Sequence, residues 1–407
     1  MSSSQAQNSA ALNGVTRKMI GAGLLAGAAI GAIATARARG LSIPRTEPDS
    51  IANWDRVLAI ATSMNKADAL TMPQRAALDA EYRALVDRCL PLVSDYMQTS
   101  IESPVERTYA FDRVDWINAN VEAFQNLLAP LNDLLIHPGA NPTVLSAMMG
   151  GLNRQIVSTE MGMLLGYLAR RVLGQYDLAL LGGESTGPGN LYFVEPNISA
   201  TERLLKLPKD EFRLWLALHE TTHVYQFEGF PWVRPYFQSL LDEYFVFLKS
   251  DLSELRHGVH GVKLILDRVR AGQREHKNWI ESLMTPEQRI VFHKIQSLMC
   301  IIEGYSNHVM NAVGRDLLRK YEDISRKFEQ RQRNRSWGEQ MLARMTGLDM
   351  KLEQYRLGEE FINAIVAARD HQAALRLWEG PENLPTMEEI RAPNLWMERV
   401  LASPGPA

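Results

Sequence analysis

The chain of 407 residues is long enough for one large domain or two, and its apolar fraction of 46% is ample for a buried core. Its 44 basic and 47 acidic residues leave a net charge of −3, so nothing indicates a nucleic-acid partner or an acidic one. The two cysteines, Cys89 and Cys300, lie in apolar helical patterns. We therefore expect buried free thiols, and neither a disulfide framework nor a cysteine metal site.

The N-terminus combines a polar stretch with an apolar segment. Residues 1–16 are rich in Ser, Ala, Asn and Gln and are expected to be disordered. The hydrophobic segment 17–39 contains an uncharged run, 19–36, between basic residues. A run of this length just spans a bilayer, so we predict a membrane anchor and membrane association through 19–36. The side of the membrane on which the rest of the chain lies is left open. A cleavable signal peptide with an A-x-A-like site at Ala34–Ala36 is one alternative, and a soluble cytoplasmic protein is the other.

The rest of the chain has mostly helical periodicity. Residues 40–50 contain two prolines and are predicted to be a linker, 51–401 to form a single domain and 402–407 a tail. From 51 to about 135, apolar residues recur at three- and four-residue spacing. Charges interrupt the long apolar stretch 144–173, so we interpret it as a buried core helix and not as a second membrane span.

The strongest strand signals are Leu178–Leu181 and Leu191–Val194, which flank a Gly-rich turn. The turn lacks the Lys-Ser/Thr of a phosphate-binding loop, and a β-hairpin is the natural interpretation. Together these patterns predict a fold that is mainly α with a small β-hairpin or sheet (α+β).

The chain is organised around residues 211–229, EFRLWLALHETTHVYQFEG, which contain an H-E-x-x-H motif. On a helix, His219 and His223 leave the same face, at the spacing that suits two nitrogen ligands of one Zn²⁺. Glu220 can reach a metal-bound water and act as general base. The apolar residues on either side of the motif predict a buried helix.

Two histidines need a third protein ligand. The metzincin pattern requires Gly and then His at fixed places after His223, where this chain has Gln and Gly. A thermolysin-like spacing would select Glu243, but Phe247, four residues further on, cannot support a ligand histidine. The third candidate, Glu303, is followed one turn later by Asn307 on the same helix face, and the apolar run before Glu303 argues against exposure. A carboxylate with polar support one turn away is the arrangement that a gluzincin needs.

Taken together, these and other segments resemble a known family, the zincin-like metallopeptidase type 2 family, which is also described as associated with the biosynthesis of a deazaflavin coenzyme. The resemblance covers roughly residues 50–401 and is far more specific than H-E-x-x-H alone. The segments that carry it are DRVDWINANVEAF (112–124), GYLARRVLGQYDLALLG (166–182), LYFVEPNI (191–198), FRLWLALHETTHVYQF (212–227), PWVRPYF (231–237), IEGYSNHVMNAVG (302–314), MKLEQYRLGEEF (350–361) and LWEGPENLPTMEEI (377–390).

The resemblance implies a zincin-like fold with Zn²⁺ as cofactor, His219, His223 and Glu303 as metal ligands, and Glu220 as the base. The chain departs from the family pattern at Asn307 and Asn311, where the family often has Asp. An Asn side chain can still accept a hydrogen bond from a ligand imidazole, but it brings no charge. Asn307 therefore remains a candidate partner of the metal ligands.

We expect a zinc-dependent metallopeptidase whose partner is a peptide or protein substrate. An inactive zincin-fold binding or assembly factor and a hydrolase of small amides are the alternatives, and the retained Glu220 argues against the first. Tyr305, His308 and Tyr225 are the nearest candidates in the sequence for stabilising the oxyanion. By analogy with zincins, the strand Leu191, Tyr192, Phe193 and Val194 is the candidate to pair with an extended substrate.

Overall fold

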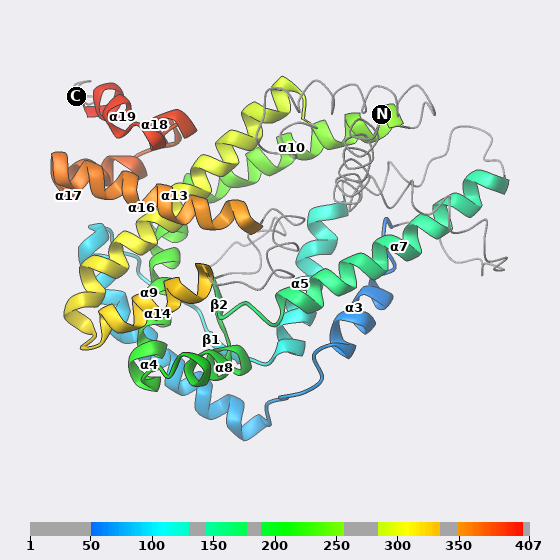
Figure 1. Cartoon of the computed structure of the whole chain (residues 1–407), viewed down its shortest axis with the longest axis horizontal. Coiled ribbons are helices and arrows are strands. Elements are labelled where there is room, and N and C mark those ends of the chain that lie inside the picture. Colours follow the sequence, from blue (N-terminus) through cyan, green and yellow to red (C-terminus); the bar gives the residue numbers. More distant parts are fainter. Residues whose placement is uncertain (1–49, 130–143, 177–188, 256–283, 334–347, 402–407) are drawn as a thin grey trace, which may run out of the picture.

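The computed structural model describes residues 50–129, 144–176, 189–255, 284–333 and 348–401 (Figure 1). The predictions for 1–16, 17–39, the linker up to residue 49, and 402–407 lie outside these ranges. The α-helices are α3 (Trp54–Ser63), α4 (Met72–Met97), α5 (Arg113–Leu128), α7 (Val144–Leu168), α8 (Glu195–Leu205), α9 (Lys209–Glu228), α10 (Val233–Leu255), α13 (Pro286–Leu317), α14 (Tyr321–Arg333), α16 (Leu348–Ala368), α17 (His371–Leu375), α18 (Met387–Arg391) and α19 (Pro393–Leu401). Two short 3₁₀ helices, η3 (Arg376–Trp378) and η4 (Pro381–Asn383), connect α17 to α18.

A small mixed sheet accompanies the helices, as the predicted α+β class requires. Its strands are β1 (Thr108–Phe111), β2 (Gly174–Tyr176) and β3 (Leu191–Val194), in the order β1-β3-β2. Strand β3 runs parallel to β1 and antiparallel to β2. The consecutive strands β2 and β3 are antiparallel, as in a hairpin. The predicted strand Leu178–Leu181 lies outside the described residues. The helical interpretation of 51–135 was wrong at β1, which is too short to stand out in the pattern.

The sheet lies between two groups of buried side chains. Leu191 and Phe193 of β3 belong to the larger core, which α4, α9, α13, α16 and the C-terminal helices also line. Val194 belongs to a smaller core formed with α3, α5 and α7. The alternation follows from strand geometry, since successive side chains point to opposite faces. In Figure 1 these helix groups accordingly lie on the two sides of the strands.

Helices α9 and α13 pack against each other in opposite directions. Near one end of the contact, Gln226 of α9 donates to the carbonyl of Ile302. Near the other end, Leu218 lies beside Gly314 of α13. Helix α13 begins with a capping box, in which Thr285 and Gln288 exchange hydrogen bonds, and Pro286 occupies its first turn. This long, well-capped helix is a rigid support for Glu303.

Helix α16 crosses α13 at an unusually short distance. A Cβ atom on Gly304 of α13 would lie 2.2 Å from the carbonyl carbon of Gly358, and one on Gly358 would lie 1.9 Å from the carbonyl oxygen of Cys300. The two glycines therefore allow backbone-to-backbone contact immediately beside Glu303. Cys89 and Cys300 are both buried and unbridged, as predicted.

The prediction of a membrane-anchored protein with a transmembrane helix was wrong. Wherever the structure describes the chain, no helix combines the length and the apolar character needed to cross a bilayer. The run 19–36 itself lies outside the described residues. Most of it is Gly or Ala, and each of these contributes little transfer free energy, so its length overstated the case for insertion.

Helix α7 packs on α3 through Gly162 and Gly166.

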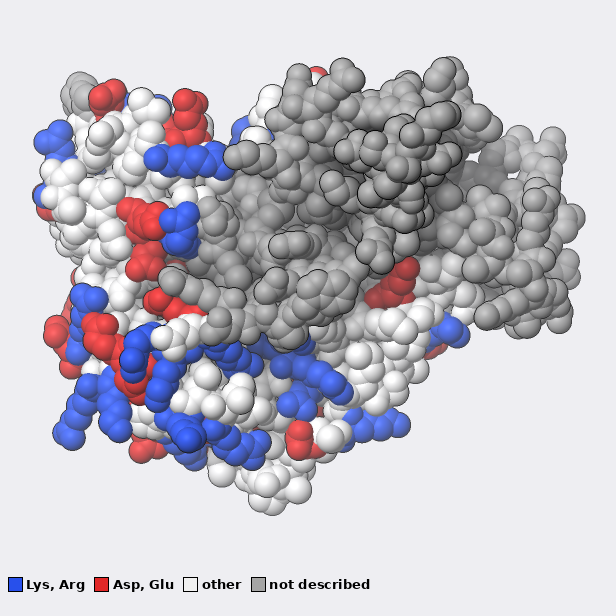
Figure 2. Space-filling view, in the orientation of Figure 1, with Lys and Arg blue, Asp and Glu red and all other residues white. Residues whose placement is uncertain are grey.

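Charged side chains are mixed over much of the surface that Figure 2 shows. Lys and Arg gather toward the lower edge of this face, and both signs intermingle at its left. Surface ion pairs join Arg315 of α13 to Glu322 of α14, and Lys327 to Asp323 within α14. Surface pairs of this kind contribute little to stability.

Candidate metal centre

The two histidines of the motif lie on one face of α9. Their Nε2 atoms are 3.2 Å apart, and the ring of His219 stacks at 6.4 Å on that of Trp215 one turn earlier. The His219 and His223 side chains are 19% and 13% exposed, so the helix is buried while the imidazoles keep an opening to solvent. The negative charges of Asp210 and Glu211 in the first turn of α9 interact favourably with its helix dipole.

Glu303 reaches the same point from α13. Its Oε2 atom lies 3.9 Å from His219 Nε2 and 3.7 Å from His223 Nε2. Ligands at tetrahedral zinc lie about 3.3 Å from one another, because zinc–ligand bonds are about 2.0–2.1 Å long. The three atoms are thus spaced almost as a zinc ion would hold them, and they form a metal-competent cluster among the described residues. Glu243, the rejected alternative, is exposed on α10.

Gln226 fixes the orientation of His223. Its amide nitrogen donates to the carbonyl of Ile302 at 2.7 Å, so its oxygen faces His223 Nδ1 at 2.8 Å. Nδ1 must then carry the proton, which leaves the Nε2 lone pair directed toward Glu303. Ser306 adds its hydroxyl to the same group, 3.3 Å from the Gln226 oxygen. This tautomer is the one that a metal ligand requires, so the donor set fits zinc.

Glu220 lies on the side of α9 that faces the sheet. It is 5% exposed and is one residue, about 100° of helix rotation, from His219. A Cβ atom built on Gly174 of β2 would lie 2.5 Å from its Oε1. The carboxylate therefore occupies space over β2 that only a glycine leaves open.

Asn307 hydrogen-bonds Glu359 of α16, and Asn311 donates to the same carboxylate at 2.7 Å. Burial raises the pKa of Glu359, and the nearby Glu329 raises it further. The structure therefore gives Asn307 a partner other than the predicted one. Its role toward the metal ligands stays a prediction.

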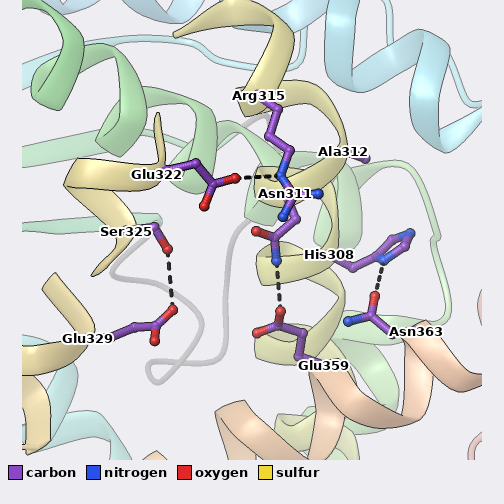
Figure 3. A pocket seen from close by; sticks show the side chains of 9 residues that line it. All are labelled: His308, Asn311, Ala312, Arg315, Glu322, Ser325, Glu329, Glu359 and Asn363. Carbon is purple, nitrogen blue, oxygen red and sulfur yellow. Dashed lines mark hydrogen bonds and ion pairs between the residues drawn. The ribbon is translucent and has the colours of Figure 1, made fainter. Parts of the chain in front are cut away.

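Asn311 and Glu359 line a polar cavity of about 530 Å³ between α13, α14 and α16 (Figure 3). Its lining includes His308, Asn311, Ala312 and Arg315 from α13, Glu322, Ser325 and Glu329 from α14, and Glu359 and Asn363 from α16. In Figure 3 most of these side chains point toward a neighbour across the cavity. Asn311 and Arg315 continue the helix stripe that begins with Glu303, at steps of four residues.

The three oxyanion candidates have contacts elsewhere. Tyr305 packs edge-to-face on Trp378, and Tyr225 hydrogen-bonds Ser94 of α4. Both tyrosines lie about 200° round their helices from the nearest ligand residue. His308 is bonded to Tyr96 and Asn363. None of these contacts supports a role at the cluster, and that role remains a prediction.

The substrate strand was predicted in the wrong place. Leu191, Tyr192, Phe193 and Val194 form β3, the central strand, which β1 and β2 pair on both sides, and all four residues are buried. An added peptide cannot pair with a strand that has no open edge. Within the described sheet, strand β2, which lies against Glu220, is the edge strand beside α9.

Sequence reasoning missed Gln226 and Gly174. Gln226 entered only as a residue that excludes the metzincin pattern, although its position three residues after His223 places it within reach of that ring. Gly174 gives no local signal, because its neighbour Glu220 is distant in the sequence. Glu359 was likewise recognisable only from the fold.

Comparison with known proteins agrees with this geometry. A family model for zincin-like metallopeptidases matches residues 52–397. The chain belongs to the zincin-like metallopeptidase family. The chain also resembles a solved structure from Chloroflexus aurantiacus described as a "putative hydrolase with a novel fold", with 40% identity and a TM-score of 0.65 over 87% of this chain and all of the other. No curated protein matches. Zincin-like membership and this neighbour support an enzyme of the hydrolase class.

Proposed function

We propose that this zincin-like protein is a zinc-dependent peptidase that cleaves amide bonds in peptides or proteins. The observation that carries the proposal is the convergence of His219, His223 and Glu303 beside the buried carboxylate of Glu220. Three protein ligands with partial exposure are typical of catalytic zinc sites, whereas structural sites are usually closed by four.

The roles of the chain's own residues follow from their positions. A zinc ion held by the three ligands would supply the Lewis acidity that polarises a carbonyl and lowers the pKa of water. Glu220 would take the proton of the attacking water and deliver it to the leaving amine. Gln226 would keep His223 in the tautomer that binds metal.

An extended substrate would lie along β2 instead of β3. Strand β2 is at the edge of the described sheet and adjoins Glu220 through Gly174. Backbone pairing with an edge strand holds a peptide without regard to its side chains. It would therefore place a scissile bond beside the base.

Replacing Glu220 by Gln tests the role of the base. The substitution keeps the size of the side chain and removes the proton acceptor, so zinc content should remain and turnover should fall about 10²–10⁴-fold. Zinc is measured on the dialysed protein, and cleavage is measured on casein and on a peptide library. Wild-type turnover in Glu220→Gln would contradict the assignment.

The same assays separate the alternatives. Cleavage of small amides without cleavage of extended peptides would favour a small-amide hydrolase. A zinc-loaded wild-type protein that turns over neither class would favour a binding or assembly role.

A further inference from the structure

We propose that Gly174 of β2 is a positioning residue for Glu220: its missing side chain sets where the carboxylate of the base lies. The inference rests on the proposed function, because it concerns the base of that reaction. Its physical basis is a contact between an edge strand and the active-site helix.

The contact leaves no room for a side chain at position 174 unless a neighbouring group moves. A Cβ atom on Gly174 would lie 2.5 Å from Oε1, 2.7 Å from Cδ and 2.8 Å from Cγ of Glu220. Real Cβ atoms essentially never approach heavy atoms so closely. A methyl group at this position therefore requires that either β2 or the Glu220 side chain move.

Strand β2 is held from several sides. Gly174 pairs with Phe193 of β3, whose ring stacks at 4.2 Å on that of Tyr82. The next residue, Gln175, accepts a hydrogen bond of 2.7 Å from the indole of Trp116. The residue after it, Tyr176, donates its hydroxyl to Glu228 at the end of α9. These bonds resist displacement of the strand.

The helix backbone at Glu220 is equally constrained, since the residues around it on α9 are buried and the neighbouring histidines face Glu303. The movable part is the Glu220 side chain, because the atoms that a methyl would meet are the far end of a flexible side chain and not backbone. Gly174→Ala should therefore displace the carboxylate while the fold and the metal ligands remain. Misplacement of a catalytic group by about 1 Å can lower the rate about 10²-fold.

The test compares Gly174→Ala with wild type in two backgrounds, Glu220 and Glu220→Ala. Alanine lacks Cγ and the carboxylate, so it removes all three atoms that the added methyl would meet. We expect Gly174→Ala to keep zinc, thermal stability and KM, and to lower kcat by roughly 10-fold or more. In the Glu220→Ala background the same substitution should cause no further loss of the residual kcat, because no carboxylate is left to displace. Should Gly174→Ala alone lower stability, the same substitution in the Glu220→Ala background should not lower it.

A spectroscopic arm does not depend on turnover. In the Co²⁺-substituted protein, Gly174→Ala should alter the visible absorption in the direction that Glu220→Gln does, since both change the group beside the metal. If wild type cleaves nothing, the proposed function fails while this arm still decides the role of Gly174. An unchanged cobalt spectrum with unchanged kcat in Gly174→Ala would overturn the inference. So would an equal loss of kcat in both backgrounds, which would indicate a role of the strand itself.

Discussion

Glu303 is the residue on which the metal assignment depends most, because it joins the motif from a distant part of the chain. Its carboxylate is buried and lies 3.7–3.9 Å from both imidazole nitrogens. The two histidines share one short motif with Glu220, and the spacing of His219 and His223 alone predicted their common helix face. Glu303 comes from a different helix far along the chain, and only its apolar surroundings and the family resemblance indicated it.

Removing the third ligand should release the metal. We expect Glu303→Ala to lose most of its bound zinc after dialysis, because two histidines alone hold the ion weakly. Glu243→Ala is the matched control: it removes an exposed glutamate that the spacing rule also nominated, and it should keep full zinc. Metal analysis of the two purified variants decides the point, and full zinc in Glu303→Ala would exclude Glu303 as a ligand.

Asn307 and Asn311 stand where the family pattern often has Asp, and their contacts in the fold give a physical reason for the amides. Both donate to the Glu359 carboxylate from successive turns of α13. An amide can make that donation, whereas an ionised aspartate at the same place would repel the carboxylate. The relation could not be predicted, since nothing in the sequence places α16 beside α13.

Among the elements, the packing of α13 on α16 depends on the missing side chains of Gly304 and Gly358. Helix propensity alone favours Ala over Gly by about 1 kcal/mol in a helix interior. The added Cβ at Gly358 would instead meet the backbone of Cys300, which cannot rotate away as a side chain can. Overpacking against backbone should therefore outweigh propensity.

We expect Gly358→Ala to lower the free energy of unfolding by about 1–3 kcal/mol, whereas helix propensity alone would raise it. Urea denaturation of the EDTA-treated protein measures this value. Ala364→Gly, at a partly exposed position in the interior of the same helix, calibrates propensity and should cost about 1 kcal/mol. A stabilised Gly358→Ala would show that the two helices can separate without cost.

The strands show which elements a sequence leaves undetermined. Leu191–Val194 was recognisable as a strand from its composition, and its antiparallel neighbour could be expected because it lies close in the chain. Its parallel partner, β1, lies far upstream in the sequence, and nothing local reveals that pairing. The substrate strand was misplaced for this reason: whether a strand is central or at an edge depends on a non-local contact.

At the scale of the whole molecule, His308 connects three helices. Its Nδ1 donates to Asn363 of α16 and its Nε2 accepts from Tyr96 of α4, each at 2.7 Å. Burial raises the pKa of Tyr96 to about 12, so its hydroxyl remains a donor. Burial lowers the pKa of His308, and the nearby His371 lowers it further, although the bond to Asn363 acts in the opposite sense. The neutral imidazole is therefore the form that the fold accommodates.

A pH dependence of stability follows from this shift. The pKa of His308 is about 6.5 in the unfolded chain and lower in the folded one. The unfolded state thus binds more protons in this window, and stability present above pH 6.5 is lost as the pH falls through the folded pKa. Urea denaturation in EDTA should give a lower free energy of unfolding at pH 5.5 than at pH 7.5. In His308→Gln, which can still donate and accept, the decline should be smaller; an identical decline would remove His308 as its source.

The antiparallel contact of α9 with α13 has a consequence for the unfolded chain. An ion bound between His223 and Glu303 would close the whole covalent path from one to the other, so it would act as a removable cross-link between two distant segments. Closure of so long a loop costs chain entropy that grows only slowly with its length. Once α9 and α13 pack together, the loop is closed and the ligand side chains are already close to one another. Binding of the ion then carries no further cost of bringing them together. Metal capture would then be coupled to the assembly of the protein core, and chelation would lower the stability of that core as well as abolish the proposed activity.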